Sequence, residues 1–261
     1  MPFESNSITC GDTLELITGI VDGTIDLVIA DIPYFGIVED EWDNQWPSLD
    51  AYISWLDTLF DHFARVLKDG KACYVYCSIS SYPHVQLCLN RHLTYASTIT
   101  WKKQRSRGNG WGFNREEICV NVKGEHTFKE VESATLMLPH LRKGSTDYSN
   151  KKRHIRRRDF KLASSIWDDI SQVCSYRKQL HPTEKPVENA RRMLEASSDI
   201  DDLVLIPFVG SGSELEAIVR LNRRYLGFEA EQTYCDIASE RLACLSLPTY
   251  EVISILKRDA S

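Results

Sequence analysis

The tetrapeptide Asp31-Ile32-Pro33-Tyr34 brings together a carboxylate, a proline-restricted backbone and an aromatic ring. It follows the β-branched run 24–30, so we expect it at the carboxyl end of a strand, with Tyr34 exposed. Exposed groups of this kind contribute little to stability, which indicates a role in chemistry. The alternative is a capped turn in which Tyr34 packs back on the core.

A glycine-rich turn, Val209–Ser213, lies between an apolar strand at 203–208 and a helix at 214–222. Gly210 and Gly212 permit a tight turn and a close approach of a ligand to the backbone. The next strand ends at Glu229, placed to accept hydrogen bonds from two ribose hydroxyls. The chain has neither GxGxxG nor GxxxxGK[ST] here, which argues against nicotinamide cofactors and nucleoside triphosphates. The alternative is that these glycines only permit the tight turn and have no role in ligand binding.

Alternating strands and helices are predicted around both segments. Expected strands lie at 7–10, 24–30, 71–78, 94–101, 117–122, 203–208 and 224–229. Expected helices are a short one near Leu14, then 48 to about 69, 81–91, 187–197, 214–222 and 234–245. The polar stretch 102–116 is expected to be a loop. This order indicates an α/β fold, a mainly parallel sheet with helices on both faces.

The middle of the chain, 123–176, lacks periodicity and is either a long insertion or a small subdomain. We therefore expect residues 1–122 and 177–261 to be two halves of one domain. The net charge of −6 hides an uneven distribution: residues 1–60 hold twelve Asp and Glu and no Lys or Arg, whereas 141–160 hold eight Lys and Arg and two Asp. The basic block suits phosphate binding, or it is a solvated loop.

Composition narrows the class of protein further. The eight cysteines show no CxxC pair and no regular spacing, so we expect reduced thiols, no disulfide framework and no metal site. No apolar run reaches the roughly 18–20 residues of a membrane span, and the acidic start does not resemble a signal peptide. We expect a soluble, cytoplasmic protein.

Together these segments resemble the β class of amino-group DNA methyltransferases that use S-adenosylmethionine. The family pattern is (D/S)PPY, a DNA-recognition region, HPTQKP, DPFxGSGT and GxE. The chain reads DIPY (31–34), a basic middle, HPTEKP (181–186), IPFVGSGS (206–213) and GFE (227–229), in that order. An opening Gly11-Asp12-Thr13-Leu14-Glu15 and SIWDD (165–169) match as well, so the resemblance spans about residues 8–245. It implies a Rossmann-like class I methyltransferase fold with an inserted target-recognition region at 123–176.

The resemblance also implies a mechanism. The Asp31 carboxylate and the Ile32 carbonyl would accept the two N–H bonds of a flipped-out base, while Pro33 restricts Ile32 and Tyr34 stacks on the base. Asp in the first position favours adenine N6, whereas Ser favours cytosine N4. The expected partner is double-stranded DNA and the expected source is a bacterium or phage. No metal or covalent nucleophile is required.

Further residues are assigned by the same resemblance. Asp12 would lie near the cofactor's adenine, Glu229 on its ribose, and Thr183 and Lys185 at its methionine end, with Lys185 pairing the carboxylate. His181 is a cofactor contact or a structural hydrogen-bonding residue. The remaining cofactor candidates are Thr13, Asp31, Phe208, Gly210, Ser211, Gly212 and Ser213. The expected DNA contacts are Arg105, Arg107, Arg115, Lys151, Lys152, Arg153, Arg156, Arg157 and Arg158.

Two departures from the pattern leave alternatives open. Ile32 stands where the family usually has Pro, and Ile206 where it has Asp. The needed group at position 32 is a carbonyl, so we expect activity to be kept; the loss of Asp at 206 affects cofactor binding more than the fold. Other readings are cytosine N4 methylation, a catalytically silent DNA-binding module, or methylation of RNA or a small amine. A homodimer is open, and a cognate restriction endonuclease would be a separate protein.

Overall fold

A computed structural model describes residues 3–35, 45–107, 113–136, 160–173 and 184–245. Eight strands form the main sheet, in the order β1-β10-β9-β2-β3-β5-β4-β8. Their bounds are β1 Ser7–Cys10, β2 Ile25–Asp31, β3 Leu67–Cys77, β4 Thr94–Arg107, β5 Phe113–Val122, β8 Ile166–Trp167, β9 Leu203–Ile206 and β10 Arg224–Glu229. All neighbours in this sheet pair in parallel except β5, which is antiparallel to both β3 and β4.

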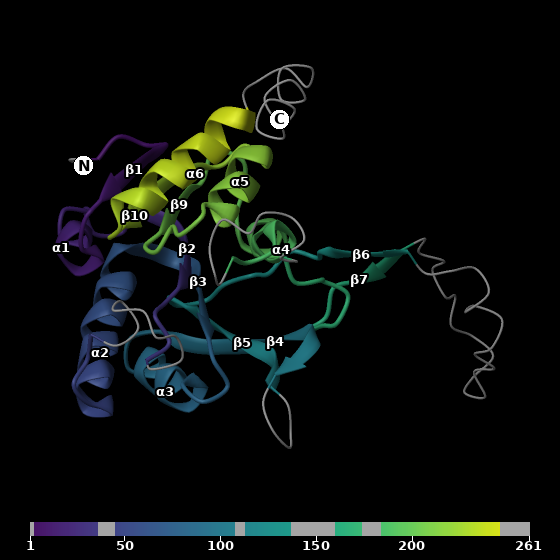
Figure 1. The fold of residues 1–261 in the computed structure, drawn as a ribbon, viewed down its shortest axis with the longest axis horizontal. Helices are drawn as coiled ribbons and strands as arrows, with labels where there is room; N and C mark the ends of the chain where they lie inside the picture. Colours follow the sequence, from purple (N-terminus) through teal and green to yellow (C-terminus); the bar gives the residue numbers. More distant parts are fainter. Residues whose placement is uncertain (1–2, 36–44, 108–112, 137–159, 174–183, 246–261) are drawn as a thin grey trace, which may run out of the picture.

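Helices cover both faces of the sheet (Figure 1). On one face α2 (Leu49–Val66) packs against α1 (Thr13–Ile17) and α3 (Tyr82–His92). On the other, α5 (Ser213–Arg220) packs between α4 (Val187–Ser197) and α6 (Gln232–Leu245). The predicted α/β layering is confirmed, and none of the helices within the described ranges is long and apolar enough to cross a membrane.

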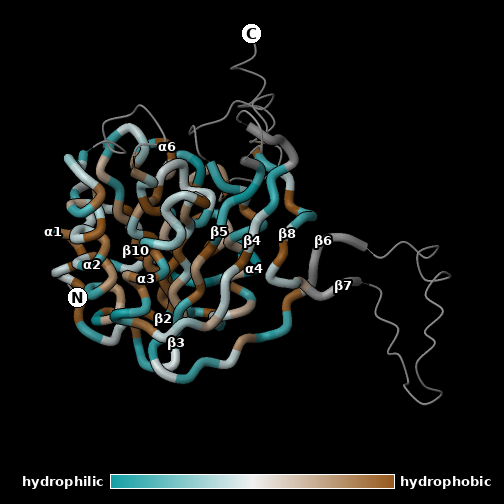
Figure 2. The backbone as a smooth tube through the Cα atoms, turned by 90° about the horizontal axis from the view of Figure 1, so that it is seen from below, coloured by the Kyte–Doolittle hydropathy of each residue, from teal (hydrophilic) through white to brown (hydrophobic). Residues whose placement is uncertain are grey.

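The core follows from sequence patterns that each element carries. Strand β2 is buried along nearly its whole length, as expected of a central strand with helices on both sides. Helix α2 begins at the N-cap Ser48, whose hydroxyl accepts a hydrogen bond from the Ala51 amide (3.2 Å), and it turns Leu56, Leu59 and Phe63 into the core. Figure 2 shows hydrophobic residues inside the body and hydrophilic residues along its outer turns.

The prediction of a loop at 102–116 is wrong. Strands β4 and β5 form an antiparallel hairpin that leaves only 108–112 outside the described residues. The register pairs Trp101 with Glu116 and Lys102 with Arg115. The polar composition suggested a loop because single-sequence periodicity does not show which charged side chains face each other across strands.

Within the described residues, three strands come from the aperiodic middle of the chain. Strands β6 (Glu132–Leu136) and β7 (Phe160–Leu162) pair with each other, and Figure 1 shows them extending from the main body. Strand β8 instead joins the main sheet beside β4. Asp169, from the SIWDD segment, accepts two hydrogen bonds (both 3.0 Å) from Arg192 of α4, and the Arg192 guanidinium lies 5.4 Å from the Trp167 ring centroid. This segment therefore fastens the edge of the sheet to α4.

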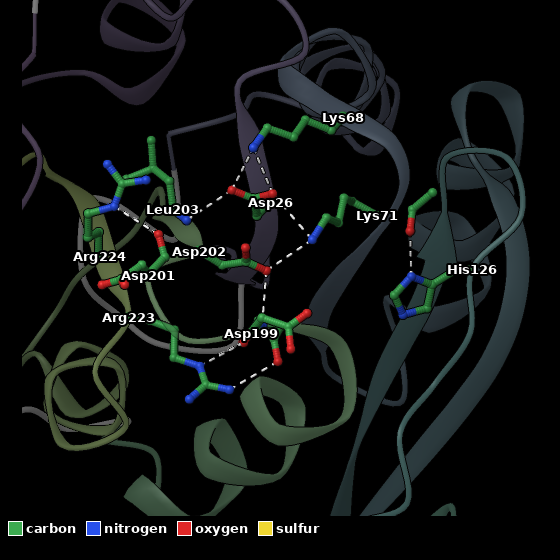
Figure 3. A network of polar contacts seen from close by, with 12 residues as sticks. Asp26, Lys68, Lys71, His126, Asp199, Asp201, Asp202, Leu203, Arg223 and Arg224 are labelled. Carbon is green, nitrogen blue, oxygen red and sulfur yellow. Dashed lines mark hydrogen bonds and ion pairs between the residues drawn. The ribbon is translucent and has the colours of Figure 1, made fainter.

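A polar network ties the amino ends of the central strands together (Figure 3). The buried Asp26 carboxylate accepts hydrogen bonds from Lys68 (2.8 and 2.9 Å) and from the Leu203 amide (3.1 Å). Lys71 bridges Asp26 (3.2 Å) and Asp202 (3.0 Å). Burial alone would raise the pKa of Asp26, but these partners hold it below its usual value. Strands β2, β3 and β9 are thus fixed at one edge, and the candidate site lies at the other.

Candidate active site

Asp31 is the last residue of β2, at the carboxyl edge of the parallel sheet. Its Oδ1 accepts a hydrogen bond from the Tyr34 hydroxyl (2.8 Å), and its Oδ2 lies 2.8 Å from the Lys185 ammonium. Ligands of open α/β sheets bind outside this edge of the strands. The structure therefore brings the predicted tetrapeptide together with one residue of the HPTEKP segment, which lies about 150 positions further along the chain.

Lys185 is buried among acidic and aromatic groups. Its ammonium also lies 3.6 Å from Glu116 Oε2, and the ring centroids of Tyr34 and Tyr76 lie 5.2 and 5.4 Å away. Burial disfavours the charged form, but the carboxylates of Asp31 and Glu116 outweigh it and raise the pKa of Lys185. The lysine is a fixed positive charge beside Asp31. Its expected pairing with a cofactor carboxylate stays a prediction.

Glu116 is the second acid of the site, and the sequence analysis missed it. It is buried at the start of the β5 apolar run and pairs with Lys103 as well as Lys185. Burial raises its pKa, while the charges of Lys185 and Lys103 lower it further than burial raises it. The signal was the hairpin itself, which pairs Trp101 with Glu116 and brings Lys103, two residues further along β4, within ion-pair distance of this acid.

Tyr34 is not exposed, contrary to the expectation. Its side chain is 9% exposed, and its hydroxyl donates to Asp31. Burial, followed by the charges of Asp31 and Glu116, raises the pKa of Tyr34, so the phenol stays protonated and can donate. The side chain thus packs back against the core, as in the alternative interpretation. Its expected contact with a target base stays a prediction.

The turn after Asp31 is held in place by α2. The Tyr52 hydroxyl donates a hydrogen bond to the Pro33 carbonyl (2.7 Å), and the Phe35 ring stacks on Tyr52 with centroids 5.3 Å apart. Phe35 has φ of 56°, a left-handed conformation that is costly for an aromatic residue. The packing against α2 compensates for this strain and fixes the position of the tetrapeptide.

The glycine turn adopts the predicted strand-turn-helix geometry. Gly210 and Gly212 have φ of 50° and 79°, and Gly212 is the N-cap of α5. A Cβ on Gly212 would lie 2.9 Å from the Ala238 Cβ of α6, so a side chain there would displace a helix. Gly210 donates its amide hydrogen to Glu229 Oε2 (2.8 Å), which places the turn directly beside the carboxylate at the end of β10.

Glu229 retains unused acceptor capacity. Its Oε1 accepts from the Glu231 amide (3.0 Å) and its Oε2 from Gly210, which leaves a second lone-pair direction on each oxygen. Burial raises the pKa of Glu229, and the backbone hydrogen bonds oppose this. A carboxylate of this kind can accept two further hydroxyl donors, such as the vicinal hydroxyls of a ribose.

The residues that follow β1 lie beside Glu229 and the glycine turn. Gly11 donates its amide hydrogen to the Glu229 carbonyl (2.8 Å), and Asp12 caps α1 through the Glu15 amide (3.1 Å). The buried Thr13 hydroxyl donates to the Pro207 carbonyl (2.5 Å). These contacts place Asp12 and Thr13 where β1, β9 and β10 meet, beside the glycine turn and Glu229. Their role in cofactor binding stays a prediction.

The remaining predicted residues divide into three groups. Ser211 and Ser213 are buried in the turn, where Arg241 bonds the Ser211 carbonyl (3.0 Å), and Phe208 lies against Trp55 with ring centroids 6.1 Å apart. Arg115 is half exposed and pairs with Glu117 (3.0 Å). Arg105 and Arg107 lie at the end of β4, and only the backbone is described at these two residues. His181, Thr183, Lys151, Lys152, Arg153, Arg156, Arg157 and Arg158 lie outside the described residues.

Two protein sequences illustrate the relatives of this chain. "DNA adenine methyltransferase YhdJ" of Escherichia coli (strain K12) is 27% identical over 98% of the chain and 88% of its own length. "Type II methyltransferase M.HpaI" of Haemophilus parainfluenzae is 28% identical over 90% of the chain and 73% of its own length.

Solved structures share the fold. The cytosine-N4-specific PvuII DNA methyltransferase aligns with a TM-score of 0.69 and 16% identity, covering 98% of this chain and 92% of its own. The M1.HpyAVI–SAM complex aligns with a TM-score of 0.61 and 19% identity, covering 90% and 98%. The class I methyltransferase fold expected from the sequence is confirmed.

A family model described as DNA methylase matches residues 25–240, a span that contains Asp31, Lys185, the glycine turn and Glu229. Methyltransferases of this family use S-adenosylmethionine. The chain belongs to the N6/N4 DNA methylase family, the amino-group DNA methyltransferases.

Proposed function

We propose that this chain transfers a methyl group from S-adenosylmethionine to the N6 amino group of adenine in double-stranded DNA. The observation that carries the proposal is the position of Asp31, an acid at the carboxyl edge of β2 that is fixed between Tyr34 and Lys185. An exocyclic amino group needs hydrogen-bond acceptors to become nucleophilic, and Asp31 provides a fixed one.

In this mechanism the Asp31 carboxylate and the Ile32 carbonyl accept the two N–H bonds of the target amine. Both groups draw the nitrogen toward tetrahedral geometry and stabilise the positive charge that develops on it. The bound cofactor supplies an electrophilic methyl group. Tyr34 borders the base, and its hydroxyl orients Asp31. Because Asp31 keeps a second lone-pair direction on each oxygen, its bonds to Tyr34 and Lys185 leave room for the amine.

The glycine turn and Glu229 fit the nucleoside end of the cofactor. The unused acceptor directions on Glu229 match the ribose hydroxyls, and the lack of space for a Cβ at Gly212 keeps the backbone close. Asp12, Thr13, Phe208, Gly210, Ser211 and Ser213 are proposed to complete that pocket, and His181, Thr183 and Lys185 the methionine end.

Adenine is favoured over cytosine by two facts. The tetrapeptide begins with Asp, and YhdJ, a relative over almost the whole chain, carries the name of an adenine methyltransferase. The fold does not separate the two bases, because the PvuII enzyme with the same fold is specific for cytosine N4. The proposed DNA contacts are Arg105, Arg107, Arg115 and the 151–158 block. A homodimer and a separate cognate endonuclease are further proposals.

A labelling experiment tests this function. The purified protein is incubated with methyl-tritiated S-adenosylmethionine and duplex DNA of mixed sequence, and the DNA is digested to nucleosides. Label in N6-methyladenine is expected, and Asp31→Asn should abolish it. Label in N4-methylcytosine would show that cytosine, and not adenine, is the target base. DNA binding without cofactor binding and without label on any DNA would show a catalytically silent DNA-binding module, and label on RNA alone would overturn the choice of substrate.

A further inference from the structure

Glu214, in the first turn of α5, is buried close to the candidate site but has no place in the mechanism above. It is 5% exposed, and its Oε2 accepts a hydrogen bond from Ser213 Oγ (2.8 Å). Its Oε1 is buried without a hydrogen-bond partner, as are the Tyr76 hydroxyl of β3 and the side-chain amide of Asn189 of α4. Buried polar atoms without partners are costly, so such a cluster beside an active site calls for a functional explanation.

The positive and negative charges near Glu214 already cancel when Glu214 itself is left uncounted. Within the described part of the site, the cations Lys185 and Lys103 face the carboxylates of Asp31 and Glu116. An ionised Glu214 would therefore add one uncompensated negative charge to a buried cluster. Burial, and then the charge of Asp31, raise the pKa of Glu214 to about 7, opposed by the Ser213 hydrogen bond and by Lys185.

Within the described residues, the other elements packed against α5 do not supply an unpaired countercharge. On α4, Arg191 is paired with Glu188 and Glu195. Arg192 is paired with Asp169 and Glu188. Tyr76 of β3 is a buried phenol whose pKa is raised by burial and by the nearby carboxylates. Arg241 of α6 is engaged by Glu184 and Glu216. Glu229 of β10 is itself an acid. Ile206, at the end of β9, stands where the family pattern has Asp, so the acid of this region lies at 214 instead of 206.

S-adenosylmethionine carries a sulfonium, an ammonium and a carboxylate, and thus a net charge of about +1 near neutral pH. We propose that Glu214 carries a proton in the cofactor-free protein and releases it to solvent when this cationic cofactor binds, so that its carboxylate becomes the cofactor's countercharge. The thioether product lacks the sulfonium charge, so Glu214 regains a proton from solvent in the product complex. This inference rests on the proposed function, since it needs the cofactor at this site.

Titration calorimetry in two buffers of different ionisation enthalpy measures the protons released on binding. For the wild-type protein and S-adenosylmethionine we expect close to one proton released at about pH 6 and none at about pH 9, because the carboxyl group is already ionised there. S-adenosylhomocysteine should release clearly fewer protons at about pH 6. This comparison needs no variant, so it stands even if a substituted protein fails to fold.

Glu214→Gln should remove the proton release and weaken cofactor affinity roughly 100-fold at about pH 8 and roughly 10-fold at about pH 6, because releasing nearly one proton at about pH 6 requires the pKa of Glu214 to fall by about 2 units on binding. Glu216→Gln, on the same helix but paired with Arg220, is the matched control and should keep the proton release. Binding heats that are independent of the buffer at every pH would overturn the inference and leave the proposed function intact. The absence of any cofactor binding would overturn both.

Discussion

Asp31 is the side chain on which the proposed chemistry depends. Asp31→Asn keeps the size of the group but replaces a charged acceptor by an amide. We expect kcat to fall by at least about 100-fold, because the amide oxygen is a weaker acceptor than the carboxylate and the stabilising negative charge is lost. Asp22→Asn, at an exposed position far from the site, is the control and should retain activity. An Asp31→Asn enzyme that keeps more than a tenth of the rate would show that another group activates the amine.

Lys185 lies between the buried Glu116 and the partly buried Asp31, and removing it should lower the free energy of unfolding by an amount that depends on pH. In Lys185→Met the carboxylates of Asp31 and Glu116 face each other without their shared cation. We expect a loss of about 3–5 kcal/mol in the free energy of unfolding at neutral pH.

The sign of the pH effect differs between the two proteins. In the wild type the lowered pKa of Glu116 contributes stability that is present above its unfolded value and lost as the pH falls. Without Lys185 the pKa of Glu116 should rise, so the variant gains stability relative to the wild type between about pH 7 and 5. Denaturant unfolding at both pH values measures this, and a deficit that does not depend on pH would contradict it.

Residue identities were predictable to a useful extent, but their pairing was not. The sequence named Asp31, Tyr34 and Lys185 as site residues, and the structure brings them together. It did not show that Tyr34 turns inward to bond Asp31, three residues before it, because the packing of this ring against the core is set by the tertiary structure. It also did not show that Lys185 bonds the same acid, because that bond joins distant parts of the chain. Glu116 was missed for the same reason.

Among the secondary-structure elements, the polar network at the amino ends of β2, β3 and β9 holds these strands together. The same strands carry the candidate site at their carboxyl ends. Asp26→Asn removes a charged acceptor that holds β2, β3 and β9 together. We expect the free energy of unfolding to fall by about 1.5–3 kcal/mol at neutral pH. Since the pKa of Asp26 is lowered in the folded protein, the wild-type advantage should be present above the unfolded pKa and vanish as the pH falls through the folded value.

Chemical denaturation between about pH 7 and 3 measures this difference. Asp69→Asn is the matched control, because Asp69 is almost fully exposed and makes only a long contact (3.7 Å) with Lys123. Equal losses in both variants would show that the network in Figure 3 does not stabilise the sheet.

Strands and helices with strong periodicity were predictable within a few residues. The expected helix at 187–197 and strand at 224–229 match α4 and β10, and the expected strand at 24–30 is displaced by one residue from β2. The hairpin of β4 and β5 was missed because polar residues are tolerated in a strand when they pair across it, as Trp101–Glu116 and Lys102–Arg115 do. The antiparallel direction of β5 was also not predictable, because the periodicity of a single segment does not show which strand it pairs with or in which direction.

For the molecule as a whole, topology brings together segments that the sequence keeps apart. Strand β9, which leads into the glycine turn, pairs with β2, which ends at Asp31. The glycine turn and the tetrapeptide are therefore neighbours although more than 170 residues separate them. The sequence order predicted both segments and the fold class, and only the strand order shows that they form one site.

The uneven charge distribution leads to a prediction about DNA binding. Replacing the basic residues of 151–158 with Gln should weaken DNA binding and reduce the slope of log affinity against log salt by about 0.9 for each DNA phosphate that the protein no longer neutralises. Cofactor affinity should not change, since the proposed pocket lies in other segments. Binding measured across a salt series checks this, and an unchanged slope would show that DNA docks elsewhere.

The central claim is methylation of adenine N6 in DNA through Asp31. Long-read sequencing of DNA from cells that express the wild-type protein or Asp31→Asn tests it most directly, because it reports the modified base together with its sequence context. The account predicts N6-methyladenine within a defined sequence in the wild-type cells and none in the variant cells. N4-methylcytosine, unmodified DNA, or the same adenine methylation in the variant would contradict it.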